Sequence, residues 1–317
     1  TWSGFRAAAG EAGHLAPCSC GTNLQLGYLD SVRIGSDIGN AGQWPGAWDG
    51  FRYGLGTIAA LWYKHRRFWV NDPDSIQIGK GCSLGEARVR ATMVSPSGGH
   101  LMLSEDLRNL DPARLEIIRR ILPAMPQAAR PLDLFEEPFP HGYPALWQLT
   151  VPSPAGRTTA LAVFNLSRSV RRWTITPRLL GIHPARRYLA LEWWSQRWLG
   201  CQRGPFELEV PAEDVAVVHA GVAGRAPSVM SVSHHISGGY IVEGVAFDER
   251  TGLLEGVLAT RPGLRLVLFG HCPPAWALAR AATFHGALGG LGGWQQELVT
   301  TGPRTGFAVP FAKRARR

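Results

Sequence analysis

Short apolar runs alternate with helical patterns over the first 123 residues. The runs at 14–20, 29–35, 68–74 and 100–105 are bounded by Gly, Pro or Asn, which is typical of β-strands. Between the runs at 68–74 and 100–105, Ser83 and Glu86 predict a capping box at the start of a helix. After the last run, Asp111 with Pro112 predicts the start of a second helix. Because strands and helices take turns in this order, the pattern predicts a parallel α/β sheet.

The pattern changes after Pro123. A Pro-rich linker leads into runs in which apolar and polar residues alternate, at 158–167, 171–179, 186–194, 205–211 and 214–220. Alternation of this kind predicts the antiparallel strands of a β-sandwich. A further β-rich stretch begins near residue 222 and contains a predicted hairpin turned at 248–252. We therefore expect three segments, which are residues 1–123, 124–221 and 222–317, the last with a basic tail.

Composition excludes some classes of protein. The 317 residues are 45% hydrophobic and 18% charged, which is enough for two or three cores, and no apolar run is long enough for a membrane span. The net charge of +9 comes from arginines spread along the chain, and the cluster at 313–317 is typical of a solvated terminus. The sequence therefore predicts neither a membrane nor a nucleic-acid partner.

The cysteines and the N-terminus bear on cofactors and location. The five cysteines are odd in number and match no zinc spacing, so we expect no disulfide framework, no metal and no cofactor. This usage favours a reducing compartment, which is the cytoplasm. Because the sequence starts without Met or a signal-peptide pattern, we expect it to begin inside a longer polypeptide.

The stretch DSVRIGSDIG, residues 30–39, places two charges on one face of a strand. Side chains alternate in an extended chain, so Arg33, Gly35 and Asp37 point the same way, and Gly35 leaves a gap between the charges. A salt bridge at a strand end explains this spacing. A sugar site at the C-terminal end of a barrel strand explains it as well.

Three motifs in the same order resemble the second half of the catalytic barrel of α-galactosidases, the melibiase-like enzymes of glycoside hydrolase families 36 and 27. They are LGYLDSVRIGSDIG at 26–39, FWVNDPDSIQIG at 68–79, and the stretch 84–123. Residues 191–200 and 206–220 resemble the β-sandwich that follows the barrel. The resemblance implies an α/β plus β fold, in which the C-terminal half of a TIM-type (β/α)8 barrel precedes an antiparallel β-sandwich.

The resemblance also implies roles for the charged residues. It makes Asp37 the general acid/base, Arg33 a ligand to sugar hydroxyls, and Asp74 a residue near the sugar. A retaining glycosidase uses one carboxylic acid to protonate the leaving oxygen and a second carboxylate, about 5 Å away, to attack the anomeric carbon. For Asp72 the sequence favours a turn that ends the strand.

Three further residues complete the expected site. Cys20 and Gly21 match positions that contact substrate at the end of the preceding strand. Trp44 is a candidate platform for the sugar ring, although a buried structural Trp is an equally good interpretation.

One departure from the family pattern limits the prediction. The family nucleophile lies in a Lys-x-Asp motif before this region, and here no lysine precedes Lys64. We therefore expect a retaining hydrolase of terminal α-galactosides in the intact protein, and no activity from this chain alone. A non-catalytic carbohydrate-binding or scaffold protein, and enzymes that act on α-N-acetylgalactosaminides or transfer galactosyl groups, remain alternatives.

The expected half barrel has a further consequence. Four strands cannot close a barrel of eight, so the parallel sheet is left with open edges, which predict self-association into a homo-oligomer.

Overall fold

The computed structural model describes most of the backbone. The described residues are 1–18, 23–35, 37, 47–79, 81–136, 142–153, 156–279, 283–288 and 291–314, with side chains except at 47–53, 156–158, 283–288 and 291. The chain divides into two compact units, one of residues 1–149, 163–171 and 210–215, and one of residues 150–162, 172–209 and 216–317. The three segments expected from sequence stay a prediction.

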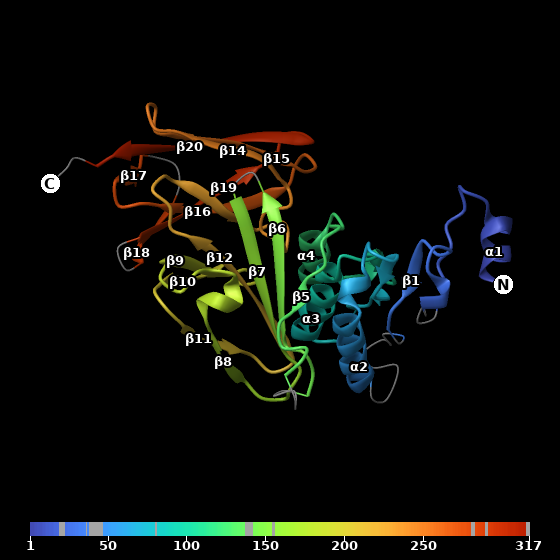
Figure 1. Ribbon diagram of the computed structural model, residues 1–317. Helices are drawn as coiled ribbons and strands as arrows, with labels where there is room; N and C mark the ends of the chain where they lie inside the picture. The colour runs from blue at the N-terminus through green and yellow to red at the C-terminus, as the bar shows by residue number, and fades with distance from the viewer. Residues whose placement is uncertain are drawn as a thin grey trace. The chain divides into compact units, whose positions relative to one another are not determined.

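Parallel strands lie in three of the four runs expected in this part of the chain, and β1 is labelled in Figure 1. Residues 14–18 of the first expected run form no strand, and an unexpected strand, β3, begins just after the run 68–74. Strand β1 pairs in parallel with β2, and β3 pairs in parallel with β4. Beside β1, the amide of Arg33 donates to the carbonyl of Pro17, so residues 14–17 run along its other side. The strands are β1 (Ser31–Arg33), β2 (Val70–Asp72), β3 (Ser75–Ile76) and β4 (Met102–Leu103). Within the described residues they do not close into a barrel, so the half barrel also stays a prediction.

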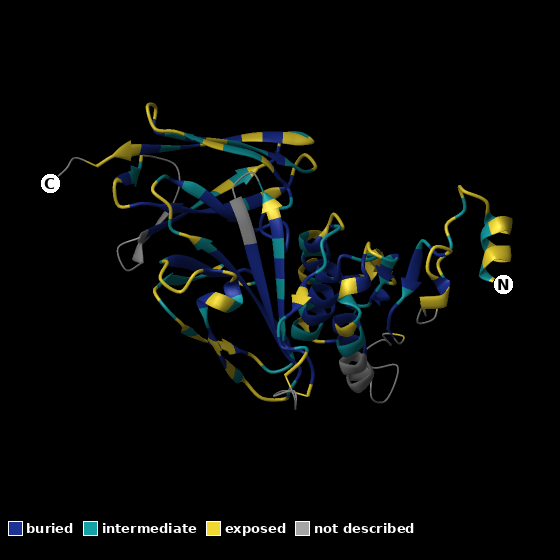
Figure 2. Cartoon of the chain, viewed as in Figure 1, coloured by how far each residue is buried: buried dark blue, intermediate teal, exposed yellow. Residues whose placement is uncertain are grey.

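Local side-chain caps explain where the helices start. Ser83 and Glu86 form the expected capping box on α3, and Asp111 caps α4 with Pro112 at its first position. Helix α3 is largely buried, as its dark colour in Figure 2 shows. The first helix was not predicted from the sequence pattern. The helices and 3₁₀ turns of this part are α1 (Trp2–Ala9), η1 (Asn23–Gln25), α2 (Ala47–Ala60), η2 (Trp62–Lys64), α3 (Leu84–Val94), η3 (Ser95–Ser97), η4 (Leu107–Asn109) and α4 (Pro112–Ile121).

A six-stranded sheet follows the helical part of the chain. Its strand order is β10-β9-β12-β7-β6-β5, and β8 and β11 form a separate pair. The described pairings of β9 with β10 and β12 are antiparallel, as expected. The bounds are β5 (Arg130–Pro131), β6 (Leu146–Ser153), β7 (Gly156–Asn165), β8 (Arg171–Ile175), β9 (Tyr188–Glu192), β10 (Arg197–Gln202), β11 (Phe206–Val210) and β12 (Asp214–Val222), with η5 (Pro177–Leu180) after β8.

The C-terminal part is a sandwich of two four-stranded sheets. The sheet orders are β13-β16-β19-β18 and β14-β15-β20-β17. Their inner faces share one apolar core, to which Leu268 and Trp294 contribute from one sheet and Leu254 and Val309 from the other. The predicted hairpin is confirmed, because β14 and β15 pair antiparallel around a turn that the Asp248 carboxylate caps. The bounds are β13 (Ser228–Val232), β14 (Val242–Asp248), β15 (Leu253–Ala259), β16 (Arg265–Cys272), β17 (Trp276–Leu278), β18 (Thr283–Leu288), β19 (Leu291–Val299) and β20 (Arg304–Lys313).

The described part of the chain includes no helix that is both long enough and apolar enough to cross a membrane.

Two histidines are buried in the second unit. The Nδ1 atom of His219 lies 2.6 Å from Ser231 Oγ, and Nε2 lies 2.9 Å from the carbonyl oxygen of Ile236. Because a carbonyl only accepts, Nε2 carries the proton and Nδ1 accepts from the serine. Burial lowers the pKa of His219 to about 4, and burial likewise lowers the pKa of His271 to about 4. Both rings are therefore neutral at neutral pH.

These histidines predict a loss of stability in acid. Between pH 6.5 and pH 4 the unfolded chain binds protons at His219 and His271 that the folded chain does not bind, so the free energy of unfolding falls as the pH falls. The full effect is about 3 kcal/mol for each histidine. Urea denaturation at pH 7, 5.5 and 4.5 measures it. His219→Gln should flatten the pH dependence, whereas His183→Gln, at an exposed position, should keep it. An unchanged pH dependence in His219→Gln would contradict this interpretation.

Candidate functional site

Strand β1 places Arg33 at its C-terminal end. The side chains of Val32 and Ile34 are buried on one face of the strand, so Arg33 points to the other. The register of the β1–β2 pair sets Arg33 directly beside Asp72. Because cross-strand partners share a face, the guanidinium and this carboxylate meet at the end of the sheet.

Three carboxylates surround the Arg33 guanidinium. Nη1 lies 2.9 Å from Asp37 Oδ1, Nη2 lies 3.0 Å from Asp74 Oδ1, and Nε lies 3.4 Å from Asp72 Oδ2. The side chains of Arg33, Asp72 and Asp74 are largely buried, whereas the side chain of Asp37 is 91% exposed. The cluster therefore has a buried part and one carboxylate that faces solvent.

A tight turn holds Asp74 in place. Its φ of 76° lies in the left-handed region, which costs an L-residue about 1 kcal/mol or more. The amide of Asp74 donates to Asp72 Oδ1 at 2.9 Å, and Asp74 Oδ1 accepts from the amide of Ser75 at 2.6 Å. Hydrogen bonds on both sides of the residue thus offset the backbone cost and fix the carboxylate.

The electrostatics of the cluster favour a permanent cation at its centre. Burial by itself lowers the pKa of Arg33, but the negative charges of Asp74 and Asp72 outweigh burial and raise it. Carboxylate oxygens accept from sugar hydroxyls, and guanidinium N–H groups donate to them. The cluster can therefore bind a polyhydroxylated ligand and present one solvent-facing carboxylate for proton transfer.

The expected site residues have different outcomes. The structure brings Arg33, Asp37 and Asp74 together, and their roles toward a substrate stay predictions. Cys20, Gly21 and Trp44 lie outside the described residues.

The turn expected at Asp72 is confirmed, because β2 ends there and its carboxylate accepts from the amide of Asp74. Its contact with Arg33 was not predicted. The strand register carries the signal that was missed, because it places Asp72 opposite Arg33. Register between strands far apart in the sequence does not follow from a local pattern.

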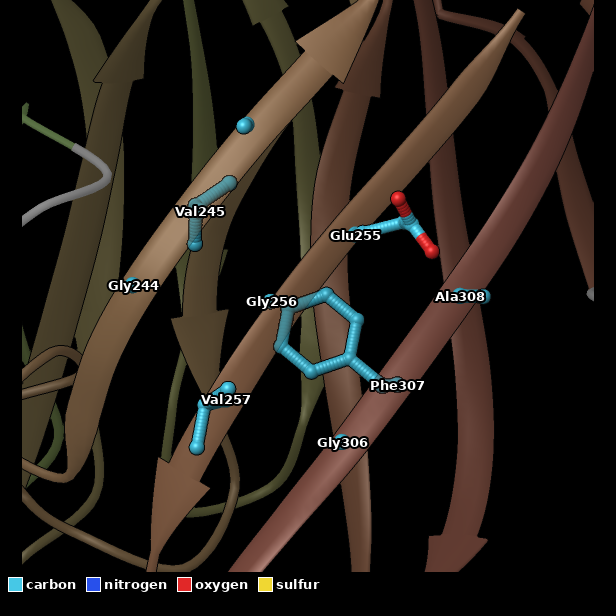
Figure 3. A pocket seen from close by; sticks show the side chains of 9 residues that line it. Gly244, Val245, Glu255, Gly256, Val257, Gly306, Phe307 and Ala308 are labelled. Atoms are coloured by element: carbon cyan, nitrogen blue, oxygen red, sulfur yellow. The ribbon is translucent and has the colours of Figure 1, made fainter. Parts of the chain in front are cut away.

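A separate concavity lies in the sandwich of the second unit. It is an open hollow of about 710 Å³ across β14, β15 and β20, and small residues such as Gly244, Gly256 and Gly306 line it together with Phe307 and Glu255 (Figure 3). It holds no histidine, cysteine or second carboxylate. Elsewhere in the described residues, no three His, Cys, Asp or Glu side chains are grouped so that they could hold a metal ion.

Comparison with known proteins identifies the fold. No family model and no curated protein matches the sequence. Among solved structures, a family 27 β-L-arabinopyranosidase variant from Geobacillus stearothermophilus, in complex with arabinose, is 15% identical with a TM-score of 0.55, over 70% of this chain and 54% of that one. The isomalto-dextranase of Arthrobacter globiformis T6, complexed with panose, is 14% identical with a TM-score of 0.51, over 98% of this chain and 62% of that one.

The described fold is similar to that of family 27 glycoside hydrolases. The α-galactosidase I of Mortierella vinacea also matches, at 18% identity and a TM-score of 0.48, over 62% of this chain and 54% of that one. The resemblance inferred from sequence is confirmed as a likeness of fold to a family 27 enzyme, and the family 36 relationship stays a prediction. The chain spans between half and two thirds of the length of these structures.

The charge cluster predicts unequal effects of removing its members. Arg33→Met leaves two largely buried carboxylates without their cation, so the free energy of unfolding should fall by about 3 kcal/mol. Asp37→Asn removes only the exposed partner and should leave it unchanged within error. Urea denaturation at pH 7 measures both.

Arg108→Met is the matched control, because Arg108 pairs with Asp106 on the surface. It should behave like Asp37→Asn. Equal stabilities of Arg33→Met and Arg108→Met would show that the cluster is not held by Arg33.

Proposed function

We propose that this chain carries the acid/base part of the active site of a retaining, α-galactosidase-like glycoside hydrolase that acts on terminal α-D-galactosides in the intact protein. The observation that carries the proposal is the Arg33 cluster. One guanidinium at the end of a parallel strand contacts both the candidate acid/base Asp37 and the candidate sugar ligand Asp74. In parallel α/β sheets this strand end is where ligands bind.

The proposed chemistry assigns one task to each side chain. Asp37, as an acid, donates its proton to the glycosidic oxygen as the bond to the anomeric carbon breaks, and as a carboxylate it then takes a proton from the attacking water. Because its side chain is exposed, Asp37 can leave its contact with Arg33 and contact a substrate instead. Arg33 and Asp74 donate to and accept from sugar hydroxyls and so orient the ring.

The second carboxylate of a retaining mechanism is not assigned to this sequence. In the resembling enzymes it lies in a Lys-x-Asp motif, and no such motif precedes the Arg33 strand here. A general acid alone contributes only about 10² to 10⁴-fold to the rate. We therefore propose that this chain binds the sugar and does not hydrolyse it efficiently by itself.

A non-catalytic carbohydrate-binding protein is the second candidate function. Such a protein would use the same contacts of Arg33 and Asp74. The two functions differ in whether Asp37 transfers a proton once a second carboxylate is supplied.

Sugar binding tests the proposal directly. Saturation-transfer NMR with the purified chain should detect methyl α-D-galactopyranoside, and the affinity should fall at least 10-fold in Asp74→Asn, because the amide cannot replace the charged acceptor. Asp106→Asn, a surface change outside the cluster, should bind like the unchanged chain. Methyl β-L-arabinopyranoside and panose, the sugar classes of the two similar structures, serve as competitors.

The opposing results are equally specific. Binding of panose but not of the galactoside would replace the proposed substrate. Hydrolysis of 4-nitrophenyl α-D-galactoside by this chain, abolished in Asp37→Asn, would show that a nucleophile lies within the printed sequence.

A further inference from the structure

The Asp72 carboxylate joins the two residues proposed to bind sugar. Its Oδ1 accepts from the amide of Asp74 at 2.9 Å, and its Oδ2 lies 3.4 Å from Arg33 Nε. The Asp72 side chain is largely buried, so neither contact is a transient surface pair. One side chain thus contacts the backbone of one candidate ligand and the head group of the other.

The contact with Asp74 sets the direction of its carboxylate. Between the two aspartates, Pro73 fixes its own φ and supplies no amide hydrogen, so the amide of Asp74 is the first donor after the strand end. The left-handed conformation of Asp74 brings its Oδ1 within reach of Arg33 Nη2 and of the amide of Ser75. Without the acceptor at Asp72, this unfavourable conformation loses a hydrogen bond that offsets its cost.

The contact with Arg33 sets the plane of the guanidinium. The group is planar and rigid, so contacts at Nε with Asp72 and at Nη2 with Asp74 fix its orientation. The remaining contact, from Nη1, goes to the exposed Asp37. A ligand can therefore displace Asp37 while the guanidinium stays in place.

We propose that Asp72 is a positioning residue that holds Arg33 and Asp74 in the geometry with which they bind a sugar. The proposal rests on the proposed function as far as the ligand is concerned. The geometry itself is independent of any ligand, and this separates the two tests.

The first test measures the geometry of the cluster alone. In the full chain, hydrogen exchange of the Arg33 Nε–H group, followed by ¹H–¹⁵N NMR and assigned with Arg33→Lys, should be at least 10-fold faster in Asp72→Ala. Asp72→Asn keeps an oxygen for the Asp74 amide but loses the charge that faces Arg33, so its exchange rate should be intermediate. If Asp72→Ala does not fold, the Arg33 Nε–H exchange rate in Asp72→Asn decides whether Asp72 positions Arg33.

The control is Asp30→Asn. Asp30 also joins an arginine, Arg6, to a backbone amide, that of Leu15, but at the opposite end of β1. It should leave the Arg33 exchange rate unchanged. A merely structural loss of stability would affect both variants alike.

The second test measures affinity for methyl α-D-galactopyranoside, which should fall at least 10-fold in Asp72→Ala and less in Asp72→Asn. Unchanged Arg33 exchange, or unchanged affinity in a chain that binds the galactoside, would overturn the positioning role. If the unchanged chain binds no galactoside, the proposed function fails, and the exchange rates of Asp72→Ala and Asp30→Asn still decide the role of Asp72.

Discussion

The contact of Arg33 with its three carboxylates is the interaction on which the candidate site depends. Three carboxylates gathered at one strand end would repel one another, and two of them are largely buried. A single planar cation offsets this repulsion, because each of its three nitrogens meets a different carboxylate. The Arg33 ion pairs therefore hold together the charged groups that form the candidate site at this strand end.

The backbone around this cluster is shaped by a close approach between two loops. Strand β2 ends at Asp72 and β3 begins at Ser75, and the chain turns between them at Pro73. A Cβ atom on Gly99 would lie 2.1 Å from the carbonyl oxygen of Asn71, so only glycine lets that loop pack behind the turn. Packing of Gly99 against Asn71 and the hydrogen bond from the Asp74 amide to Asp72 thus both support the turn. This support offsets the cost of the left-handed conformation of Asp74.

Several features of the fold and of the candidate site could be predicted from the sequence, because they depend on residues that lie close together along the chain. The Arg33–Asp37 ion pair joins residues four apart, and helix caps such as Ser83 act within three residues of their partner. The expected strand alternation does not explain the ion pair, because β1 ends at Arg33 and Asp37 lies beyond it. The contact of Asp72 with Arg33 could not be predicted, because it depends on the pairing of strands about forty residues apart. Asp72 therefore ends the strand as expected and also makes a contact with Arg33 that no local pattern indicates.

A crystal structure of the chain with bound D-galactose tests the central claim most directly. The account predicts a sugar ring at the end of β1, with hydroxyl oxygens within hydrogen-bonding distance of Arg33 and Asp74, and with Asp72 still in contact with both residues. Galactose bound at another place, such as the concavity at Glu255 and Phe307, or an Arg33 side chain turned away from Asp74, would contradict it.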